Sequence, residues 1–297
     1  MKNVCLKSII YSLFVMLFVH CQTAKEIKEI TSGNTTRKYL LHIPANYNSK
    51  EKVPLILVLH GGGGNGRNAE KMTWFSQKAD KENFIVAYPY GTNKLFSEKL
   101  LTWNAGNCCG HALDKNVDDI EYIKQLILSI KNQYSIDANK VFVTGMSNGG
   151  MMSYRIGCEL SEYVTGIAPV SGAMNVTTCK PQKSISVIII HGKNDQQVLY
   201  EGGSPKTKVD RHERTDKSVK FAEEFWRNEN GCTNRKVTKT GKVERVTYRC
   251  KRAKLSVISI DDEGHTWPGG NKGFFGADTP TKEISATEEI YQFFLYE

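Results

Sequence analysis

The chain has 297 residues, a formal net charge of +9 and 40% hydrophobic residues. This length supports one large hydrophobic core, and no internal repeat or low-complexity linker indicates a second domain. The positive residues are spread along the chain, without a basic stripe interleaved with aromatic residues and without a nucleic-acid-binding motif. The charge therefore indicates a solvated surface, and we expect no nucleic-acid partner.

The first twenty residues have the pattern of a signal peptide. Lys2 and Lys7 precede an apolar run over residues 8–19, which is too short for a comfortable membrane span. Cys21 follows directly and is the lipidation candidate of a bacterial lipoprotein signal, although Phe18-Val19-His20 departs from the small residues usual there. Simple secretion is the rival interpretation. Both predict an extracytoplasmic protein that contacts a membrane at most through a lipid anchor on Cys21.

The sequence after Cys21 is polar, and we expect residues 22–36 to be a lead-in to a single folded domain over residues 37–297. Apolar and β-branched residues predict a first strand over 37–43 and a buried strand over 53–60. A third short strand is expected over 84–87. These elements, with the strands and helices that alternate further along, favour an α/β fold.

A run of glycines, Gly61-Gly62-Gly63-Gly64, follows His60 at the end of the second strand. It lacks the Gly-Lys-Ser/Thr ending of a phosphate-binding loop and the spacing of a dinucleotide fingerprint. A His-Gly-Gly-Gly sequence is instead the form in which hydrolases present a backbone N–H to an oxyanion. Gly62 is our first candidate for this donor, ahead of Gly63.

Residues 89–117 show little helical or strand pattern, and long loops of this kind in compact domains are usually functional or tied down. Cys108 and Cys109 are candidates to tie the loop. Trp103 either forms a wall of a substrate cleft or packs beneath the loop. An amphipathic helix with acidic residues at its start is predicted over 118–134.

The next strand ends in Gly145-Met146-Ser147-Asn148-Gly149, the G-x-S-x-G pattern of a nucleophile elbow. A serine on a sharp strand-to-helix turn needs neighbours without a Cβ, which explains the glycines. Ser147 is therefore the candidate nucleophile, and the backbone N–H of Asn148 is a candidate oxyanion donor. An ordinary glycine-rich turn is the alternative interpretation.

A serine nucleophile needs a base, and the base needs an acid that orients it. Asp195 follows a buried strand at 186–191, and His265 follows another at 255–260, in the order expected after a nucleophilic serine. The loops at the carboxyl ends of parallel strands meet at one edge of a sheet. We therefore predict a Ser147–His265–Asp195 triad. Asp261 and Asp262 are competing acids, and His60 and His191 are histidines with a structural interpretation.

Six cysteines follow Cys21, and an even number in an exported protein indicates disulfides. Fifteen pairings are possible for six cysteines. We favour Cys232–Cys250, which would close a hairpin, and leave Cys108, Cys109, Cys158 and Cys179 to pair among themselves. No C-x-x-C spacing occurs, so no metal site is expected.

Five motifs in order resemble the secreted esterase and polyhydroxybutyrate-depolymerase family, which overlaps with the feruloyl and acetyl-xylan esterases of carbohydrate esterase family 1. They are His60–Asn65, Trp103–Gly110, Gly145–Met151, His191–Asp195 and Gly264–Gly270. The resemblance implies an α/β-hydrolase fold, with a mostly parallel central sheet and helices on both faces. It also implies the same triad, acyl-enzyme chemistry on an ester substrate, and no cofactor.

The substrate expected first is a feruloyl or acetyl ester of a plant polysaccharide. Trp103 and Trp267 are the expected stacking surface for a phenolic acid or a sugar. An oligomer of 3-hydroxybutyrate is the alternative, and a catalytically inactive surface binding protein of the same fold is the second. The sequence shows no separate module for binding carbohydrate or polymer, which favours soluble esters.

Overall fold

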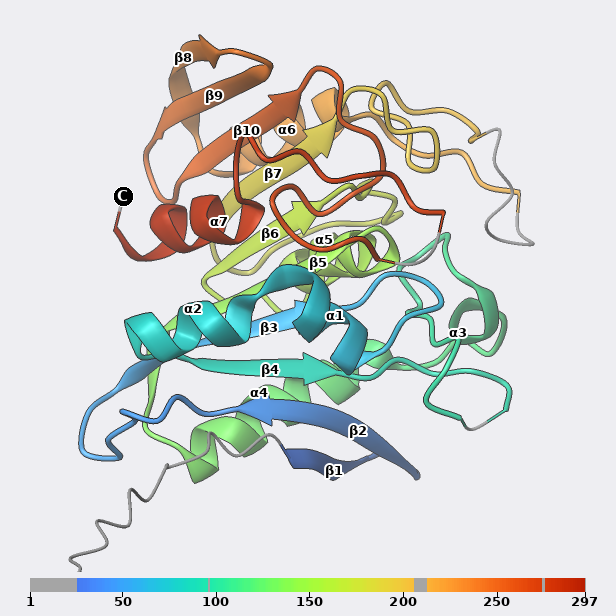
Figure 1. Cartoon of the computed structure of the whole chain (residues 1–297), viewed down its shortest axis with the longest axis vertical. Helices are drawn as coiled ribbons and strands as arrows, with labels where there is room; N and C mark the ends of the chain where they lie inside the picture. The colour runs from blue at the N-terminus through green and yellow to red at the C-terminus, as the bar shows by residue number, and fades with distance from the viewer. Residues whose placement is uncertain (1–25, 96, 206–212, 274–275, 297) are drawn as a thin grey trace, which may run out of the picture.

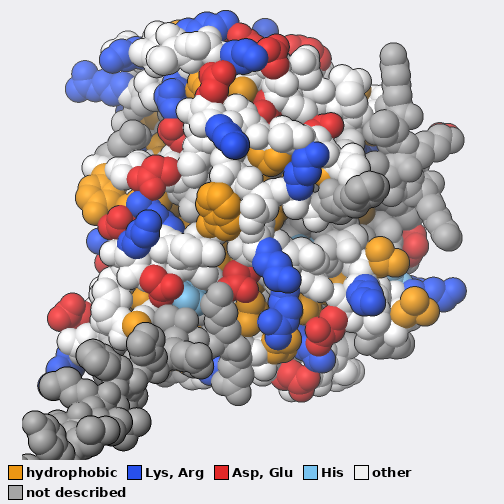
Figure 2. Space-filling model, in the orientation of Figure 1, with side chains coloured by type: hydrophobic (Ala, Val, Ile, Leu, Met, Phe, Trp, Pro, Cys, Tyr) orange, Lys and Arg blue, Asp and Glu red, His pale blue; other side chains and the backbone are white. Residues whose placement is uncertain are grey.

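A computed structural model describes residues 26–95, 97–205, 213–273 and 276–296. The expected signal peptide and the lipidation candidate Cys21 lie outside these residues. Within them, no helix has the length and the apolar character needed to cross a membrane. Figure 2 shows positive and negative side chains intermixed over one face of the molecule, in keeping with a solvated surface.

The described part of the chain contains ten strands and seven helices, joined by loops. The strands are β1 (Glu26–Ser32), β2 (Thr35–His42), β3 (Val53–Leu59), β4 (Ile85–Pro89), β5 (Ile136–Met146), β6 (Gly166–Val170), β7 (Ser186–Gly192), β8 (Cys232–Thr240), β9 (Val243–Cys250) and β10 (Leu255–Ile260). The helices are α1 (Gly66–Thr73), α2 (Phe75–Glu82), α3 (Gly110–Asp114), α4 (Asp119–Gln133), α5 (Asn148–Glu159), α6 (Val219–Glu229) and α7 (Ala286–Leu295).

All ten strands form one sheet in the order β1-β2-β4-β3-β5-β6-β7-β10-β9-β8. The six central strands, from β4 to β10, are parallel, and the two strands at each edge are antiparallel. The parallel strands point toward one edge of the sheet, at the right of Figure 1. The chain moves from β3 outward to β4 and then returns to β5, so the strand order reverses between β3 and β5. Ligand sites in open α/β sheets form at such a switch point, beyond the carboxyl ends of the strands.

Helices cover both faces of the sheet, with α1, α2 and α7 on one face and α4, α5 and α6 on the other (Figure 1). Strand β3 shows why both faces are apolar. Leu55, Leu57 and Leu59 belong to the hydrophobic cluster that includes α4, α5 and α6. Ile56 and Val58 belong to the cluster on the opposite face. Successive side chains of a strand point to opposite faces, so a continuous apolar run fits a strand covered on both sides. The expected fold class is confirmed.

The structure corrects the expected lead-in over residues 22–36, because residues from Glu26 onward belong to the sheet. Strand β1 pairs antiparallel with β2 from Glu26 opposite Leu41 to Ser32 opposite Thr35. Its polar side chains gave little strand signal. An edge strand tolerates such a sequence because the ladder satisfies its backbone on one side, and half-buried Ile30 packs against the core.

Candidate active site

Ser147 lies on the turn between β5 and α5 with a backbone φ of 57° and ψ of −123°. A positive φ is uncommon for residues other than glycine and costs free energy, and such residues concentrate at functional sites. The turn is fixed because the Ser147 N–H donates to the Val170 carbonyl at 3.0 Å and the Met151 N–H donates to the Ser147 carbonyl at 2.8 Å. This is the conformation of a nucleophile elbow.

The two glycines of the pentapeptide are required by close packing. A Cβ on Gly145 would lie 2.6 Å from the Gly149 carbonyl oxygen, and a Cβ on Gly149 would lie 2.5 Å from the His60 carbonyl oxygen. Both distances are far below van der Waals contact. The elbow can therefore approach strand β3 only where these residues have no side chain.

The glycine loop after β3 lies against the elbow. A Cβ on Gly61 would lie 3.5 Å from the Ser147 Cβ, and a Cβ on Gly62 would lie 3.7 Å from the Asn148 Cβ. The Gly63 N–H is already committed, since it donates to the Leu101 carbonyl at 2.8 Å. Of the two expected donors, this leaves Gly62 as the better candidate. The Asn148 N–H lies at the first residue of α5, where the helix dipole also favours negative charge.

His60 is a structural histidine that orients the glycine loop. Its Nε2 accepts from the Gly91 N–H at 2.9 Å, so Nδ1 carries the proton and donates to the Gly61 carbonyl at 2.8 Å. The imidazole is only 1% exposed. Burial lowers the pKa of His60 to about 4, which keeps the ring neutral and this tautomer in place.

The side chain of Asn148 clasps the backbone of Trp103. Asn148 Oδ1 accepts from the Trp103 N–H at 2.8 Å, and its Nδ2 donates to the Trp103 carbonyl at 3.0 Å. The Trp103 indole N–H donates to the His60 carbonyl at 3.0 Å. Asn148 thus ties the long loop after β4 to the end of β5, and the Trp103 indole ties it to the end of β3. The G-x-S-x-G pattern assigns a role only to the N–H of Asn148, so sequence reasoning missed the clasp.

The candidate acid and base are in direct contact. His265 Nδ1 lies 2.7 Å from Asp195 Oδ2, while Asp195 Oδ1 accepts from the N–H groups of Gln197 at 2.8 Å and Val198 at 2.9 Å. Burial alone would raise the pKa of the Asp195 carboxyl, but hydrogen bonds from His191 and His265 outweigh it and hold the pKa well below its usual range. Asp195 is therefore ionised at neutral pH and fixes the His265 proton on Nδ1, which leaves Nε2 free to accept a proton.

His191 is a second histidine on the same carboxylate. Its Nε2 lies 2.8 Å from the Val198 carbonyl oxygen and 3.3 Å from Asp195 Oδ2. Both oxygens are acceptors, so Nε2 carries the proton and is shared between them. The structural interpretation of His191 was expected, whereas its contact with the acid was not. The signal was available, because His191 lies near the end of β7 and Asp195 lies in the loop that follows this strand.

The base is placed beside the elbow by the strand that lies between them. Val170 accepts from Ser147, and the next residue, Ser171, donates its hydroxyl to the Thr266 carbonyl at 3.1 Å. The His265 N–H donates to Asp278 Oδ2 at 2.8 Å, which holds the loop from its other side. The three expected triad residues therefore gather at the carboxyl edge of the sheet.

Neither tryptophan offers the expected stacking surface. Trp103 is 0% exposed and Trp267 is 1% exposed. Trp267 packs edge-on to Phe75, 6.1 Å between ring centroids, and donates its indole N–H to the Thr287 hydroxyl at 3.1 Å. Both indoles hold loops onto the core, so the prediction that they stack on a substrate is wrong for this structure. The packing alternative for Trp103 is correct.

The competing acids Asp261 and Asp262 form ion pairs with lysines. The Asp261 carboxylate pairs with Lys193 at 2.8 Å and with Lys239 at 2.6 Å. Asp262 pairs with Lys242 at 2.7 Å. These are surface ion pairs, and each carboxylate is already engaged by lysine.

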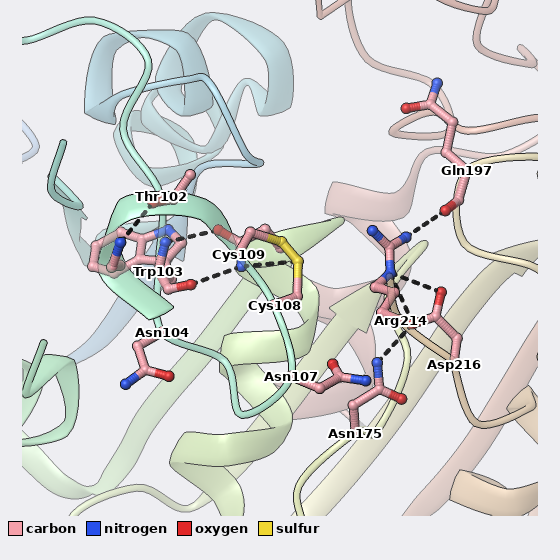
Figure 3. Close-up of a disulfide and its surroundings, with 12 residues drawn as sticks. Thr102, Trp103, Asn104, Asn107, Cys108, Cys109, Asn175, Gln197, Arg214 and Asp216 are labelled. Carbon is pink, nitrogen blue, oxygen red and sulfur yellow. Dashed lines mark hydrogen bonds and ion pairs between the residues drawn. A yellow bond between two sulfur atoms is a disulfide. The ribbon is translucent and has the colours of Figure 1, made fainter. Parts of the chain in front are cut away.

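Three disulfides are present in the described residues: Cys108–Cys109, Cys158–Cys179 and Cys232–Cys250. The expected Cys232–Cys250 pairing is confirmed, as is pairing among the other four. Figure 3 shows the Cys108–Cys109 pair beside Trp103, where Cys109 donates its N–H to the Trp103 carbonyl. Asn148 Nδ2 lies 3.8 Å from Cys108 Sγ, so this disulfide adjoins the clasp.

A buried polar network supports the acid loop (Figure 3). Arg214 donates to both oxygens of Asp216 and to the carbonyl of Gln197, two residues beyond the acid. Asp216 also accepts from Asn175 Nδ2 at 2.7 Å. Asn175 belongs to the loop after β6. The network therefore joins the loops that follow β6 and β7, and sequence patterns gave no sign of it.

The sheet order, the helices on both faces, the elbow and the glycine loop together define the α/β-hydrolase fold. The profile of the Phospholipase/Carboxylesterase family matches residues 45–222. The chain belongs to this family.

Proteins similar to this chain include feruloyl and acetylxylan esterases, which confirms the expected resemblance. Feruloyl esterase B of Piromyces equi is 25% identical over 245 residues, covering 80% of this chain and 44% of that protein. The bifunctional acetylxylan esterase/xylanase XynS20E of Neocallimastix patriciarum is 28% identical over 161 residues, covering 54% and 22%. This chain thus spans less than half the length of these two relatives. The acetyl xylan esterase from Aspergillus awamori aligns with a TM-score of 0.60 at 16% identity, covering 81% of this chain and 94% of that one, and shows the shared fold.

Proposed function

We propose that the protein is a serine esterase that cleaves carboxylic esters through an acyl-enzyme on Ser147. The observation that carries the proposal is the His265–Asp195 contact of 2.7 Å at the edge of the sheet where the strained Ser147 turn lies. A carboxylate that is ionised, buried and bonded to one imidazole nitrogen prepares the other nitrogen to act as a base. Membership of a family named for carboxylesterases supports the same chemistry.

The proposed reaction has two steps. His265 Nε2 takes the proton of Ser147 Oγ as this oxygen attacks the ester carbonyl, and the N–H groups of Asn148 and Gly62 bind the oxyanion, each contributing about 3 kcal/mol. His265 then gives the proton to the departing alcohol as the ester C–O bond breaks. Water, deprotonated by the same histidine, attacks the acyl-enzyme and releases the acid.

The proposed substrates are feruloyl or acetyl esters of plant polysaccharides. The names of the relatives support this substrate class, and Ser147 is half-buried, so part of the residue is exposed to solvent. An oligomer of 3-hydroxybutyrate belongs in the same test as a comparison.

The function is tested with the Ser147→Ala variant. The wild-type protein should hydrolyse methyl ferulate or an acetylated xylo-oligosaccharide and be labelled by a fluorophosphonate probe. Ser147→Ala should lose label and activity by several orders of magnitude, because removal of the nucleophile of a triad has that effect. Its circular dichroism spectrum should match that of the wild type. A folded Ser147→Ala variant that keeps its esterase activity would remove Ser147 from the mechanism.

We also propose an extracytoplasmic location, which the signal-like residues 1–20 and three disulfides support. Cell fractionation tests this directly. Palmitate labelling of the wild type, set against Cys21→Ala, separates a lipid anchor from free secretion.

A further inference from the structure

The loop after β4 presents two leucines to solvent, Leu95 at 74% exposed and Leu100 at 69% exposed. Leucine at such exposure is normal when it occurs singly and has no structural role. Leu100 differs from Leu95 in its surroundings. A Cβ on Gly63 would lie 4.0 Å from Leu100 Cδ2, so the side chain lies alongside the oxyanion loop.

Leu100 also has a left-handed backbone conformation, with φ of 56°. A left-handed residue with a side chain costs roughly 1–2 kcal/mol, and glycine is the residue that avoids this cost. An exposed leucine at such a position gains no core packing that would offset the strain. Local strain of this kind persists at functional sites when the surrounding structure over-determines it.

The surrounding structure does fix the loop. Leu101 exchanges hydrogen bonds with the glycine loop, accepting from the Gly63 N–H at 2.8 Å and donating to the Gly64 carbonyl at 3.3 Å. Asn65, the N-cap of α1, donates its side-chain amide to the Glu98 carbonyl at 2.7 Å. Inside the loop, Asn93 Oδ1 accepts from the Leu95 N–H at 3.0 Å. The backbone on both sides of Leu100 is therefore held in place.

We propose that Leu100 is a specificity-determining residue that contacts the ring of an aromatic acyl group during ester hydrolysis. A Cβ on Gly61 would lie 3.5 Å from the Ser147 Cβ, and the Gly64 N–H donates to the Gly61 carbonyl at 3.0 Å, so residues 61–64 form a tight turn that keeps Gly63 close to Gly61. An acyl group longer than acetyl, with its carbonyl oxygen at Gly62, reaches Leu100, whereas acetyl does not. The leucine offers only methyl groups, which suit the face of an aromatic ring rather than sugar hydroxyls. This inference rests on the proposed esterase function. Of the two proposed substrate classes, it favours feruloyl esters over acetyl esters.

The test compares 4-nitrophenyl ferulate with 4-nitrophenyl acetate, which share one leaving group. Leu100→Ala should lower the ratio of kcat/KM for ferulate over acetate by about tenfold, the lower end of what lost apolar contact with a substrate costs. Leu100→Met should have a ratio of kcat/KM close to that of the wild type, because methionine keeps a large apolar side chain at this position. Leu95→Ala is the matched control, an equally exposed leucine of the same loop, and should leave the ratio unchanged.

Leu100→Gly separates substrate contact from folding. Glycine relieves the left-handed strain, so this variant should unfold at the same or higher denaturant concentration and still lose the ratio. An unchanged ratio in Leu100→Ala, or an equal loss in Leu95→Ala, overturns the assignment. A loss that appears on feruloyl-arabinose but not on methyl ferulate would place Leu100 on the alcohol side and also overturn it. Wild-type hydrolysis of acetate alone overturns it while leaving the esterase intact, and hydrolysis of neither ester overturns both proposals.

Discussion

The Asp195 carboxylate receives hydrogen bonds on both oxygens, two from backbone N–H groups and two from imidazoles. A lone buried carboxylate would take up a proton, because burial disfavours its charge. The four donors reverse this preference. A depressed folded-state pKa contributes stability above the unfolded value near 4, and this contribution is lost as the pH falls through the folded-state pKa. The acid therefore keeps its charge in mildly acidic as well as neutral solution.

His191 is expected to act as a positioning residue for this acid. His191→Phe removes the Nε2–H donor, and a hydrogen bond to a charged group contributes about 1.5–3 kcal/mol. We expect kcat to fall by roughly tenfold or more, with KM little changed, since the histidine does not reach the substrate. His191→Gln, whose amide can place an N–H at the Nε2 position, should recover most of the loss. Steady-state kinetics of the two variants measure the effect, and a His191→Phe enzyme with wild-type kcat would contradict it.

The long loop between β4 and α4 shows how elements are joined at the site. Trp103 is held by Asn148 from α5, and Asn104 donates its N–H to Asp119 of α4 at 2.8 Å. Asp119 is 0% exposed and pairs with Arg37 of β2 at 2.8 Å. Three elements that are distant in sequence thus meet on the part of this loop that precedes α3.

The clasp predicts a specific loss of stability. Asn148→Ala leaves the buried Trp103 N–H without a partner, which costs about 1–3 kcal/mol, whereas the Trp103 carbonyl still accepts from the Cys109 N–H at 2.9 Å. We expect the free energy of unfolding to fall by about 1–3 kcal/mol in urea denaturation, although the Asn148 N–H itself is retained. The control is Asn107→Ala, which removes only a surface hydrogen bond to Thr215 from the same loop. Equal stability of the two variants would contradict the role of the clasp.

Elements with strong apolar patterns were predictable from the sequence, and weakly patterned ones were not. Strands β3, β7 and β10 lie within a residue or two of their expected bounds, since continuous β-branched runs have few other solutions. Helices α1 and α2 were missed because they are short, polar on one side and separated only by Trp74 at φ 59°.

At the site, residues whose chemistry follows from strand ends were predictable, and residues whose role depends on tertiary contact were not. Ser147, Asp195 and His265 follow strands in a known order. Asp119 resembled a helix-start residue because it follows Asp118, which does cap α4 by accepting from the Glu121 N–H at 2.9 Å. Its burial against Arg37 involves 82 residues of separation, and no local pattern encodes it.

At the scale of the whole molecule, the disulfides act on different parts of the sheet. Cys158–Cys179 joins the end of α5 to the loop after β6, across 21 residues. Cys232–Cys250 joins β8 to β9 at the base of the edge hairpin, across 18 residues. Each removes chain entropy from the unfolded state and so stabilises the fold.

Loss of the α5 disulfide should therefore be measurable on its own. The double substitution Cys158→Ala with Cys179→Ala should lower the free energy of unfolding by about 3 kcal/mol, the entropy expected for a closed loop of about this length. Thermal unfolding with and without reductant is the second measurement. Reductant should lower the Tm of the wild type by more than it lowers the Tm of the double variant. A wild-type Tm that reductant leaves unmoved would argue that these thiols are free.

The parallel sheet brings together the proposed nucleophile, acid and base from residues 147, 195 and 265. The base follows β10, which is the last strand in sequence order in the described part of the chain. A nascent chain released before β10 would carry the serine without any group to deprotonate it. The proposed ester cleavage therefore requires that nearly the entire polypeptide has been synthesised and folded. Under the proposed extracytoplasmic location, a chain that crosses the membrane before β10 has folded carries no assembled triad while it is inside the cell.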